Sequence, residues 1–187
     1  MKKVLLAGVV ALCVGCTTAA KQAYYTAKGP QGNCLLVRSD GMDPLRKYNS
    51  MEVVRFQNDL PGIIENSLVS TVQSDIVREL KEKGLFLEVT AVPAFQKGAT
   101  QTPTAVLRGR LVDITSDKIP GQKLIGGGNH LIAQVEVVDK ASGKVIAVAN
   151  IRGVIKSVLE GGESDLAHGM ARGAKKLCEK LGKRERK

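Results

Sequence analysis

The sequence LIAQVEVVDKASGKVIAVANIRGVI runs from Leu131 to Ile155 and decides the fold. On either side of a polar segment, apolar residues recur at every second position, which places them on one face of a β-strand. The polar segment, residues 139–144, contains the small and turn-forming residues of a hairpin connection. The stretch therefore predicts a long antiparallel hairpin with an apolar face that other elements must cover.

Four further strands are predicted from the same alternation. The clearest is residues 104–115, where Leu107 and Leu111 alternate with Arg108 and Arg110. This pattern predicts that the two arginines lie on the outward face of the strand. The other three predicted strands are residues 34–38, 51–56 and 85–92.

Two amphipathic helices are predicted to cover the sheet. Residues 59–83 carry apolar side chains at steps of four, and Gly84 is a natural stop after the last turn. The second helix begins at residues 163–165, whose acidic and capping groups favour a helix N-terminus. The apolar stripes of the two helices are Ile64, Leu68, Val72, Ile76 and Leu80, and Leu166, Met170, Ala174, Leu177 and Leu181.

These elements indicate an α+β fold. We expect a mostly antiparallel sheet of about five strands, with the two amphipathic helices packed on one face. No internal repeat or second domain boundary is visible, so residues 33–187 are interpreted as a single domain with a basic C-terminal tail. Residues 16–32 lack an apolar period and are predicted to be a flexible tether. The alternative is an N-terminal strand or arm packed on the domain.

The first 15 residues have the layout of a secretory signal peptide. A basic start is followed by an apolar run at residues 4–14, which is shorter than the roughly 20 residues that span a bilayer. Val14-Gly15-Cys16 resembles the bacterial lipobox, and the resemblance implies cleavage before Cys16 and acylation of that cysteine. The alternatives are plain secretion and an N-terminal transmembrane helix.

Acylation implies that the membrane is a partner, through the N-terminal acyl chains. Two or more chains hold a protein stably at a bilayer, whereas one binds only marginally. Thr17 stands where an Asp tends to retain such lipoproteins in the inner membrane. The resemblance therefore favours the outer membrane, with the domain facing the periplasm.

The charge of the chain points to anionic partners. Without the signal peptide, 26 Lys and Arg face 18 Asp and Glu, a net charge of +8. Export removes nucleic acid from reach, and with no Trp, three Phe and three Tyr the chain is poor in stacking platforms. Another envelope protein or an anionic envelope polymer is the expected partner.

No catalytic, metal or cofactor motif stands out. His130 and His168 have no second histidine at metal-binding spacing, and Gly126-Gly127-Gly128 leads into a strand rather than a helix N-terminus. We therefore expect neither an enzyme nor a cofactor, but a lipoprotein with a non-catalytic binding or structural role. The alternatives are a periplasmic carrier of a lipid or glycolipid and, third, an envelope hydrolase.

The C-terminal segment is a candidate contact for an anionic surface. The alternative is a solvated helix face and tail. Its basic residues are Lys175, Lys176, Lys180, Lys183, Arg184, Arg186 and Lys187.

Cys34 and Cys178 are a candidate disulfide. They are the two thiols left after processing, in a compartment that often oxidises them. Chain ends often lie close together in single domains, and a helix packed on a sheet brings such positions together. The alternative is two separate buried thiols.

A short series of motifs resembles a known family. Residues 122–128 form a Gly-rich turn, a strand follows to Val138, residues 139–143 match D-x-x-[ST]-G, and a second strand begins at Val145. This order is similar to that of an uncharacterised bacterial lipoprotein family, domain of unknown function 4410, over roughly residues 51–181. Element order also resembles, more loosely, envelope lipoproteins that assemble secretion or transport machinery. Neither resemblance implies catalytic residues.

Overall fold

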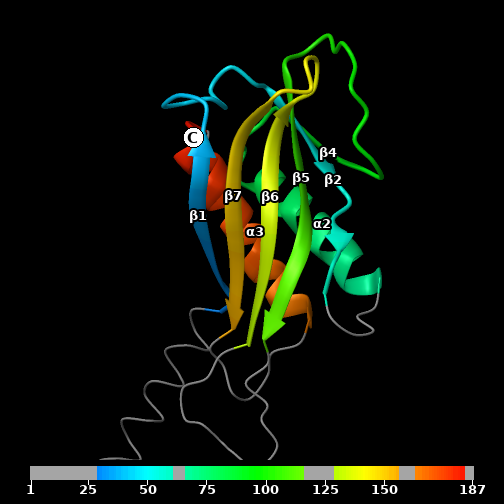
Figure 1. Ribbon diagram of the computed structural model, residues 1–187, viewed down its shortest axis with the longest axis vertical. Coiled ribbons are helices and arrows are strands. Elements are labelled where there is room, and N and C mark those ends of the chain that lie inside the picture. Colours follow the sequence, from blue (N-terminus) through cyan, green and yellow to red (C-terminus); the bar gives the residue numbers. More distant parts are fainter. Residues whose placement is uncertain (1–28, 61–65, 116–128, 156–162, 184–187) are drawn as a thin grey trace, which may run out of the picture.

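The computed structural model describes residues 29–60, 66–115, 129–155 and 163–183. Over these ranges the chain forms a seven-stranded mixed sheet and two long helices (Figure 1). The elements in chain order are β1 (Gln31–Ser39), β2 (Ser50–Val54), β3 (Gln57–Asn58), α2 (Asn66–Glu82), β4 (Glu88–Val92), β5 (Thr104–Thr115), β6 (Asn129–Asp139), β7 (Val145–Ile155) and α3 (Glu163–Lys180).

The predicted hairpin is confirmed and forms the centre of the sheet. β6 and β7 pair antiparallel from Asn129 opposite Ile155 to Val138 opposite Val145. Asp139 organises the turn, because its Oδ1 accepts hydrogen bonds from the backbone N–H and the hydroxyl of Ser142, both at 2.7 Å. β5 adds antiparallel to β6 and β1 adds antiparallel to β7, so four strands form an antiparallel half.

The other half of the sheet differs from the prediction of a mostly antiparallel sheet of about five strands. The strand order is β1-β7-β6-β5-β2-β4, and β2 is parallel to both β4 and β5. The short β3, which the sequence did not predict, is also parallel to β5. The reason is topological: α2 lies between β2 and β4, and a helical crossover returns the chain to the end from which it started.

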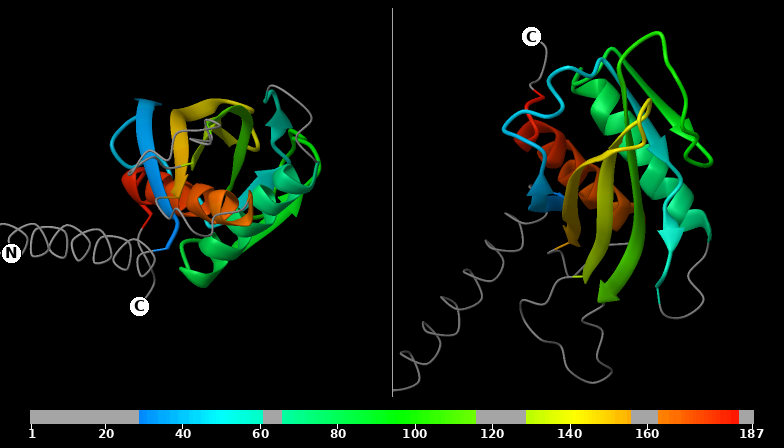
Figure 2. Two further views of the ribbon diagram at one scale, coloured as in Figure 1. Left: turned by 90° about the horizontal axis from the view of Figure 1, so that it is seen from below. Right: turned by 45° about the horizontal axis from the view of Figure 1, so that its top comes forward.

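Both helices pack on one face of the sheet, as predicted (Figure 2). The stripe of α2 is buried at Val72, Ile76 and Leu80, and that of α3 at Met170 and Leu177, all with no exposed surface. The predicted start of the first helix at residue 59 is wrong: Asp59 and Leu60 are not helical, because the Asp59 N–H donates to the Leu111 carbonyl of β5. Residues 61–65 lie outside the described ranges, and α2 is described from Asn66. The predicted glycine-rich segment 126–128 lies outside the described ranges as well.

Glycines bring the backbone of α3 onto the sheet. Gly32 on β1 and Gly153 on β7 are directly paired, and α3 crosses this pair with Gly169 and Gly173. A Cβ at Gly153 would lie 2.6 Å from the carbonyl oxygen of Leu166, and one at Gly173 would lie 2.9 Å from that of Asn33. Real Cβ atoms essentially never come within 3.0 Å of such neighbours. The helix therefore contacts the sheet at a distance that only glycine permits.

Basic side chains of α3 close the outer edge of β1. Lys176 donates to the Gly32 carbonyl at 2.7 Å and Lys180 to the Cys34 carbonyl at 2.8 Å. One turn earlier, Arg172 donates to the Pro30 carbonyl. The three cations are spaced one helical turn apart and the carbonyls one strand repeat apart, so the two periods match. Unpaired acceptors of an edge strand are thus satisfied within the molecule.

Tyr48 fastens the loop before β2 to the turn of the hairpin. Its hydroxyl donates to Asp139 Oδ2 at 2.6 Å. This hydrogen bond, with those from Ser142, lowers the pKa of Asp139 to about 2. Burial and the same carboxylate raise the pKa of the Tyr48 phenol.

Replacing Tyr48 with Phe should raise the pKa of Asp139 towards its usual value near 3.9. A carboxyl whose pKa is lowered by folding stabilises the fold above the unfolded-state value, and this contribution disappears as the pH falls to about 2. The variant should therefore lose less stability than the parent between about pH 4 and pH 2. Carboxyl NMR titration and urea unfolding at several pH values measure both effects. Ser142→Ala, which keeps the tyrosine, should give a smaller rise, and an unchanged Asp139 pKa in Tyr48→Phe would contradict the account.

Candidate functional site

The face of the sheet opposite the helices carries rows of polar side chains. Because neighbouring strands are in register, Arg110 lies opposite Gln134, and Gln134 lies opposite Asn150. Two residues earlier on β5, Arg108 lies opposite Glu136 in the same way. The sequence prediction that both arginines face outward is confirmed.

These rows form the floor of a groove of about 800 Å³. One end lies against β1, and the other lies against the end of β2 and the segment that follows β4. The lining residues are Val37, Val54, Arg55, Gln57, Pro93, Ala94, Phe95, Arg108, Gly109, Arg110, Gln134, Val135, Glu136, Val148 and Asn150.

A small apolar cluster closes the end of the groove near β4. Val54, Val106 and Val138 are buried on the outward face of the sheet, and Phe95 packs against them. Phe95 belongs to the polar loop of residues 93–103, which joins β4 to β5, and it folds back over the strands. A single Phe in a polar segment was the only signal of this contact in the sequence.

Arg108 is held in place from two sides. Its Nε and Nη2 donate to Glu136 Oε2 at 2.9 and 2.7 Å, and its guanidinium lies 5.3 Å from the centre of the Phe95 ring. Both members of the ion pair are more than a third exposed, so the pair contributes little to stability. Its effect is to fix the position of a guanidinium in the floor of the groove.

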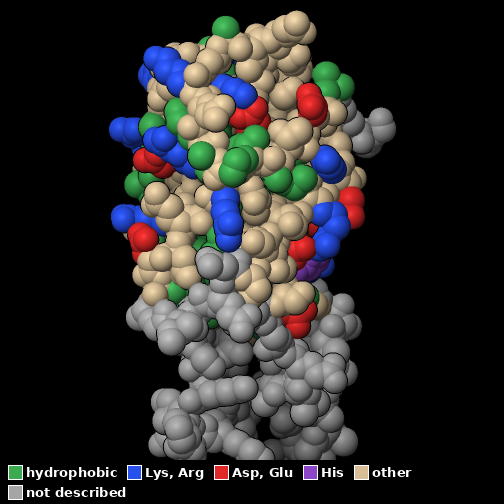
Figure 3. Space-filling model, turned by 90° about the vertical axis from the view of Figure 1, so that its right-hand side faces the viewer, with side chains coloured by type: hydrophobic (Ala, Val, Ile, Leu, Met, Phe, Trp, Pro, Cys, Tyr) green, Lys and Arg blue, Asp and Glu red, His purple; other side chains and the backbone are tan. Residues whose placement is uncertain are grey.

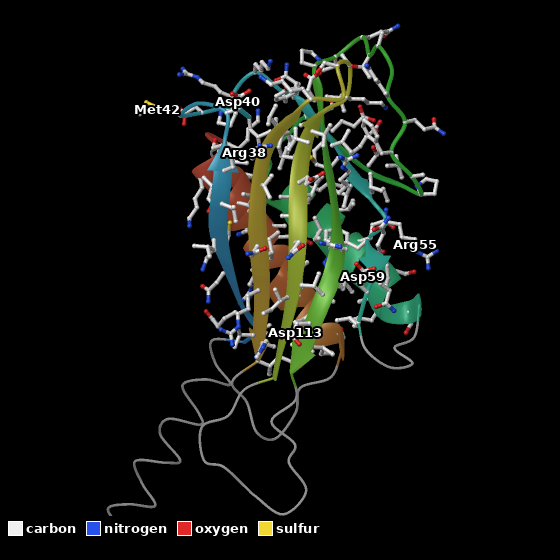
Figure 4. The ribbon with its side chains drawn as sticks, in the orientation of Figure 1. Arg38, Asp40, Met42, Arg55, Asp59 and Asp113 are labelled. Carbon is white, nitrogen blue, oxygen red and sulfur yellow. The ribbon has the colours of Figure 1, made fainter. Side chains whose placement is uncertain are left out.

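Arg110 and Arg55 continue the positive charge towards β2. Arg110 donates to Gln134 Oε1 at 3.1 and 2.8 Å and lies 3.4 Å from Asp59 Oδ2. Figure 4 shows Arg55 projecting away from the ribbon on the side where β4 lies. The groove lining thus contains three arginines and one carboxylate, Glu136.

The β1 side of the groove is apolar and irregular. Leu35 and Val37 are 66% and 62% exposed, although both are large aliphatic residues. The pairing of β1 with β7 shifts between Leu36 and Arg38, so a bulge lies at Val37. Exposed apolar side chains beside a charged groove are typical of a surface that contacts another molecule.

The basic residues predicted to contact an anionic surface have intramolecular partners where they are described. Lys175 lies 3.4 Å from Glu179, and Lys176 and Lys180 bind carbonyls of β1. Lys183 is buried with its ammonium 5.0 Å from the centre of the Phe86 ring. Arg184, Arg186 and Lys187 lie outside the described residues. Contact with an anionic surface therefore stays a prediction.

The histidines have separate neighbours. His130 lies 3.6 Å from Asp113 and next to Arg152, and His168 lies 3.4 Å from Arg78. Within the described ranges, no group of three His, Cys, Asp or Glu side chains is arranged to hold a metal ion. Cys16, the predicted lipidation site, lies outside those ranges.

Cys34 and Cys178 are free thiols that lie in the same part of the core. The Lys180 bond to the Cys34 carbonyl places the last turn of α3 over this strand position. Burial raises the pKa of both thiols, that of Cys178 to about 12, and the neighbouring Cys34 adds to the rise at Cys178. The two cysteines are thus neighbouring free thiols, and a disulfide between them stays a prediction.

If Cys34 and Cys178 bond on oxidation, the cross-link would close a loop through most of the domain. Chain entropy gives about 4–5 kcal/mol for such a loop, before any strain. We expect a reductant to lower the melting temperature of the oxidised full chain, and to leave a Cys178→Ala variant unchanged. Alkylation of both thiols in the oxidised, unfolded protein would contradict the prediction.

Comparison with known proteins defines the fold of the chain. No protein-family model matches the sequence, and no curated protein matches it. Among solved structures, the chain is similar to the PelC dodecamer from Paraburkholderia phytofirmans, with a TM-score of 0.54 and 17% identity over 83% of this chain and 100% of that chain. A single-substitution variant of PelC in another crystal form gives a TM-score of 0.52 at 15% identity, over the same shares of the two chains. At these identities the likeness is one of fold.

A weaker likeness is to a lipoprotein from Neisseria meningitidis, with a TM-score of 0.41 and 13% identity over 70% of this chain and 98% of that one. None of the helices in the described ranges is long and apolar enough to cross a membrane.

Proposed function

We propose that this chain is a lipid-anchored protein of the bacterial cell envelope that binds an anionic partner without catalysis. The observation that carries the proposal is the groove on the uncovered face of the sheet, with its floor of oriented polar side chains. The motif at Cys16 supplies the anchor, and the domain of unknown function 4410 resemblance supports the envelope class. Thr17 at the position after the cysteine favours placement at the outer membrane.

The chemistry of the groove supports binding rather than catalysis. Among its described lining residues there is no Ser, Thr, Cys, His or Lys, so a nucleophile with its base is not assembled there. Instead, guanidinium, amide and carboxyl groups are paired with one another across the strands. Such pairs fix donors and acceptors in position before a partner arrives, which lowers the entropy cost of binding.

The charge of the groove favours an anionic partner. Three arginines line it against Glu136, in a mature chain whose net charge is +8. Guanidinium groups bind carboxylates and phosphates through paired hydrogen bonds. The exposed Leu35 and Val37 beside the groove add apolar contact for a partner with mixed chemistry. An acidic segment of another envelope protein or an anionic envelope polymer has the required properties.

A carrier for a lipid or glycolipid is the alternative function. It would need an apolar cavity between sheet and helices, since such sites are concave and bury most of the ligand. In the described chain that space holds Leu107, Ile151 and Met170, which have no exposed surface. The packing therefore favours the open face of the sheet as the binding site.

Photo-crosslinking in native envelopes tests the groove. A photoreactive residue at Asn150, in the groove, should form a covalent adduct, and one at Lys81, exposed on α2, should not. Replacing Arg108 and Arg110 with Ala should remove the adduct, whereas Arg46→Ala, an exposed arginine outside the groove, should preserve it. High salt during irradiation should also reduce the yield of the adduct, because it screens the charges of the groove. Equal adducts at both positions, or no effect of the groove arginines, would contradict the proposal.

A further inference from the structure

The two edges of the sheet differ in their hydrogen bonding. At β1 the outward carbonyls are occupied by cations of α3, as described above. β4 forms the other edge and pairs with β2 only. The hydrogen bonds of β2 show which backbone groups of β4 point outward, away from β2.

The outward groups of β4 belong to Val89 and Ala91. The Ser50 N–H donates to the Pro103 carbonyl next to β5, so Met51 and Val53 turn their backbone groups towards β4. In a parallel ladder such residues bond to the two residues that flank their partners. Since Met51 lies opposite Val89 and Val53 opposite Ala91, the groups of Val89 and Ala91 point away from β2. No hydrogen bond to them is formed by any backbone or side chain that the structure describes.

The surroundings of this edge are apolar and lack the cations that close β1. Leu87 is 68% exposed, and Ala91, Pro93 and Ala94 are exposed as well. Figure 3 looks at this side of the molecule and shows hydrophobic side chains gathered across its middle. An edge strand with free backbone groups and apolar neighbours favours addition of another strand.

Two opposite charges frame the edge. Glu88 lies at the start of β4, and Arg55 follows directly after the pair formed by Val54 and Val92 at its end. Both side chains are exposed, and within the described chain neither makes a side-chain ion pair or hydrogen bond. An antiparallel copy of β4 laid along this edge would bring the start of one strand beside the end of the other.

We infer that β4 pairs antiparallel with β4 of a second copy of this chain, about a two-fold axis at Thr90. Val89 then exchanges both backbone hydrogen bonds with Ala91 of the second copy, and the two sheets become continuous. Each copy contributes the same surface, as in the isologous interfaces of most dimers.

Side-chain chemistry selects this register. Glu88 of one copy lies opposite Val92 of the other copy. In that second copy Val92 pairs with Val54 on the next strand, and Arg55 follows Val54. The backbone of Arg55 in the second copy is therefore about two strand spacings of 4.8 Å from Glu88 of the first. The long arginine and the glutamate can meet across that distance, and the two-fold axis makes the contact twice. Leu87 of each copy lies opposite Pro93 of the other, so exposed apolar groups cover each other. The pairing does not use the Arg108 and Arg110 rows of the groove floor or the anchor, although Arg55 and Pro93 also line one end of the groove. It does not depend on the proposed function.

A disulfide trap tests the pairing in the full chain. At the axis, Thr90 and its copy form a pair without mutual hydrogen bonds, whose Cα atoms lie about 4.5 Å apart. That distance suits a disulfide. In detergent extracts, oxidised Thr90→Cys should migrate as a covalent dimer on a non-reducing gel. Leu35→Cys, a more exposed position on the closed edge, should run as a monomer on the same gel, as should the parent.

A charge swap then tests the register. Arg55→Glu or Glu88→Arg alone should raise the dimer Kd about tenfold, because each turns two attractive contacts into repulsive ones. The double variant should restore the parent value. Melting curves that match the parent exclude a folding defect in any of them. The proposal is overturned if Thr90→Cys forms no more dimer than Leu35→Cys, or if the swap fails to restore binding.

Discussion

Replacing Gly32 with alanine is expected to lower the free energy of unfolding by about 3 kcal/mol or more. The added methyl would lie 2.7 Å from the carbonyl carbon of Arg172 and closer still to backbone atoms of Gly169 and Gly173. All three neighbours are main-chain atoms of a helix, which cannot rotate away as a side chain can. Relief of the clash requires α3 to move off β1 and β7, and the helix buries Met170 and Leu177 in the core.

Gly98→Ala is the matched control for Gly32→Ala. A Cβ at Gly98 meets nothing within 4 Å, and its backbone needs no positive φ. We expect urea unfolding to give a parent-like midpoint for Gly98→Ala and a much lower midpoint for Gly32→Ala. A loss below about 1 kcal/mol at Gly32 would show that the contact between helix and sheet is looser than described.

The second large effect concerns the anchor. In Cys16→Ser the hydroxyl cannot accept the thioether-linked lipid, so we expect the protein to move from the membrane fraction to the soluble fraction. The physical reason is that several acyl chains together hold a protein at a bilayer, with about 0.8 kcal/mol for each buried CH₂. The +8 charge of the mature chain can retain only a salt-sensitive remainder.

Cys13→Ser is the control for Cys16→Ser, because Cys13 lies in the same segment but before the predicted cleavage site. It should remain bound to membranes after extraction with high salt. Metabolic labelling with a fatty acid should mark the parent and Cys13→Ser, and should leave Cys16→Ser unlabelled. If Cys16→Ser resists salt extraction as the parent does, lipidation is not what holds the protein at the membrane.

The sequence was sufficient for elements whose signal is local. The alternation from Leu131 to Ile155 predicted β6 and β7, and steps of four predicted α2 and α3, because period and burial are linked along one element. The pairing of β2 with β4 and β5 was not predictable in the same way. Met51 pairs with Val89 on one side and Ala105 on the other. All three residues are apolar, and nothing in their identity indicates which strands pair or whether the pairing is parallel.

In the candidate site too, local features were predictable from the sequence, and contacts between distant segments were not. Alternation showed that Arg108 and Arg110 face outward, but their partners Glu136 and Gln134 depend on a register set between distant segments. The lysines of α3 were interpreted as a candidate surface for anions because basic residues cluster in the C-terminal segment. Periodicity could not show that Lys176 and Lys180 reach across to carbonyls of β1, since that requires knowing which strand lies beside the helix.

The bonding of β1 also determines how the domain bears mechanical load. The proposed anchor at Cys16 lies fifteen positions before the start of β1, so any pull between membrane and partner enters the domain through this strand. Force along the strand axis acts in shear on the β7 ladder and on the three cation–carbonyl bonds together, rather than opening them one at a time. Detachment of β1 would also have to separate Gly32 from the helix that covers it. The strand nearest the proposed anchor is therefore bonded so that it resists being peeled away under a pull from the proposed partner.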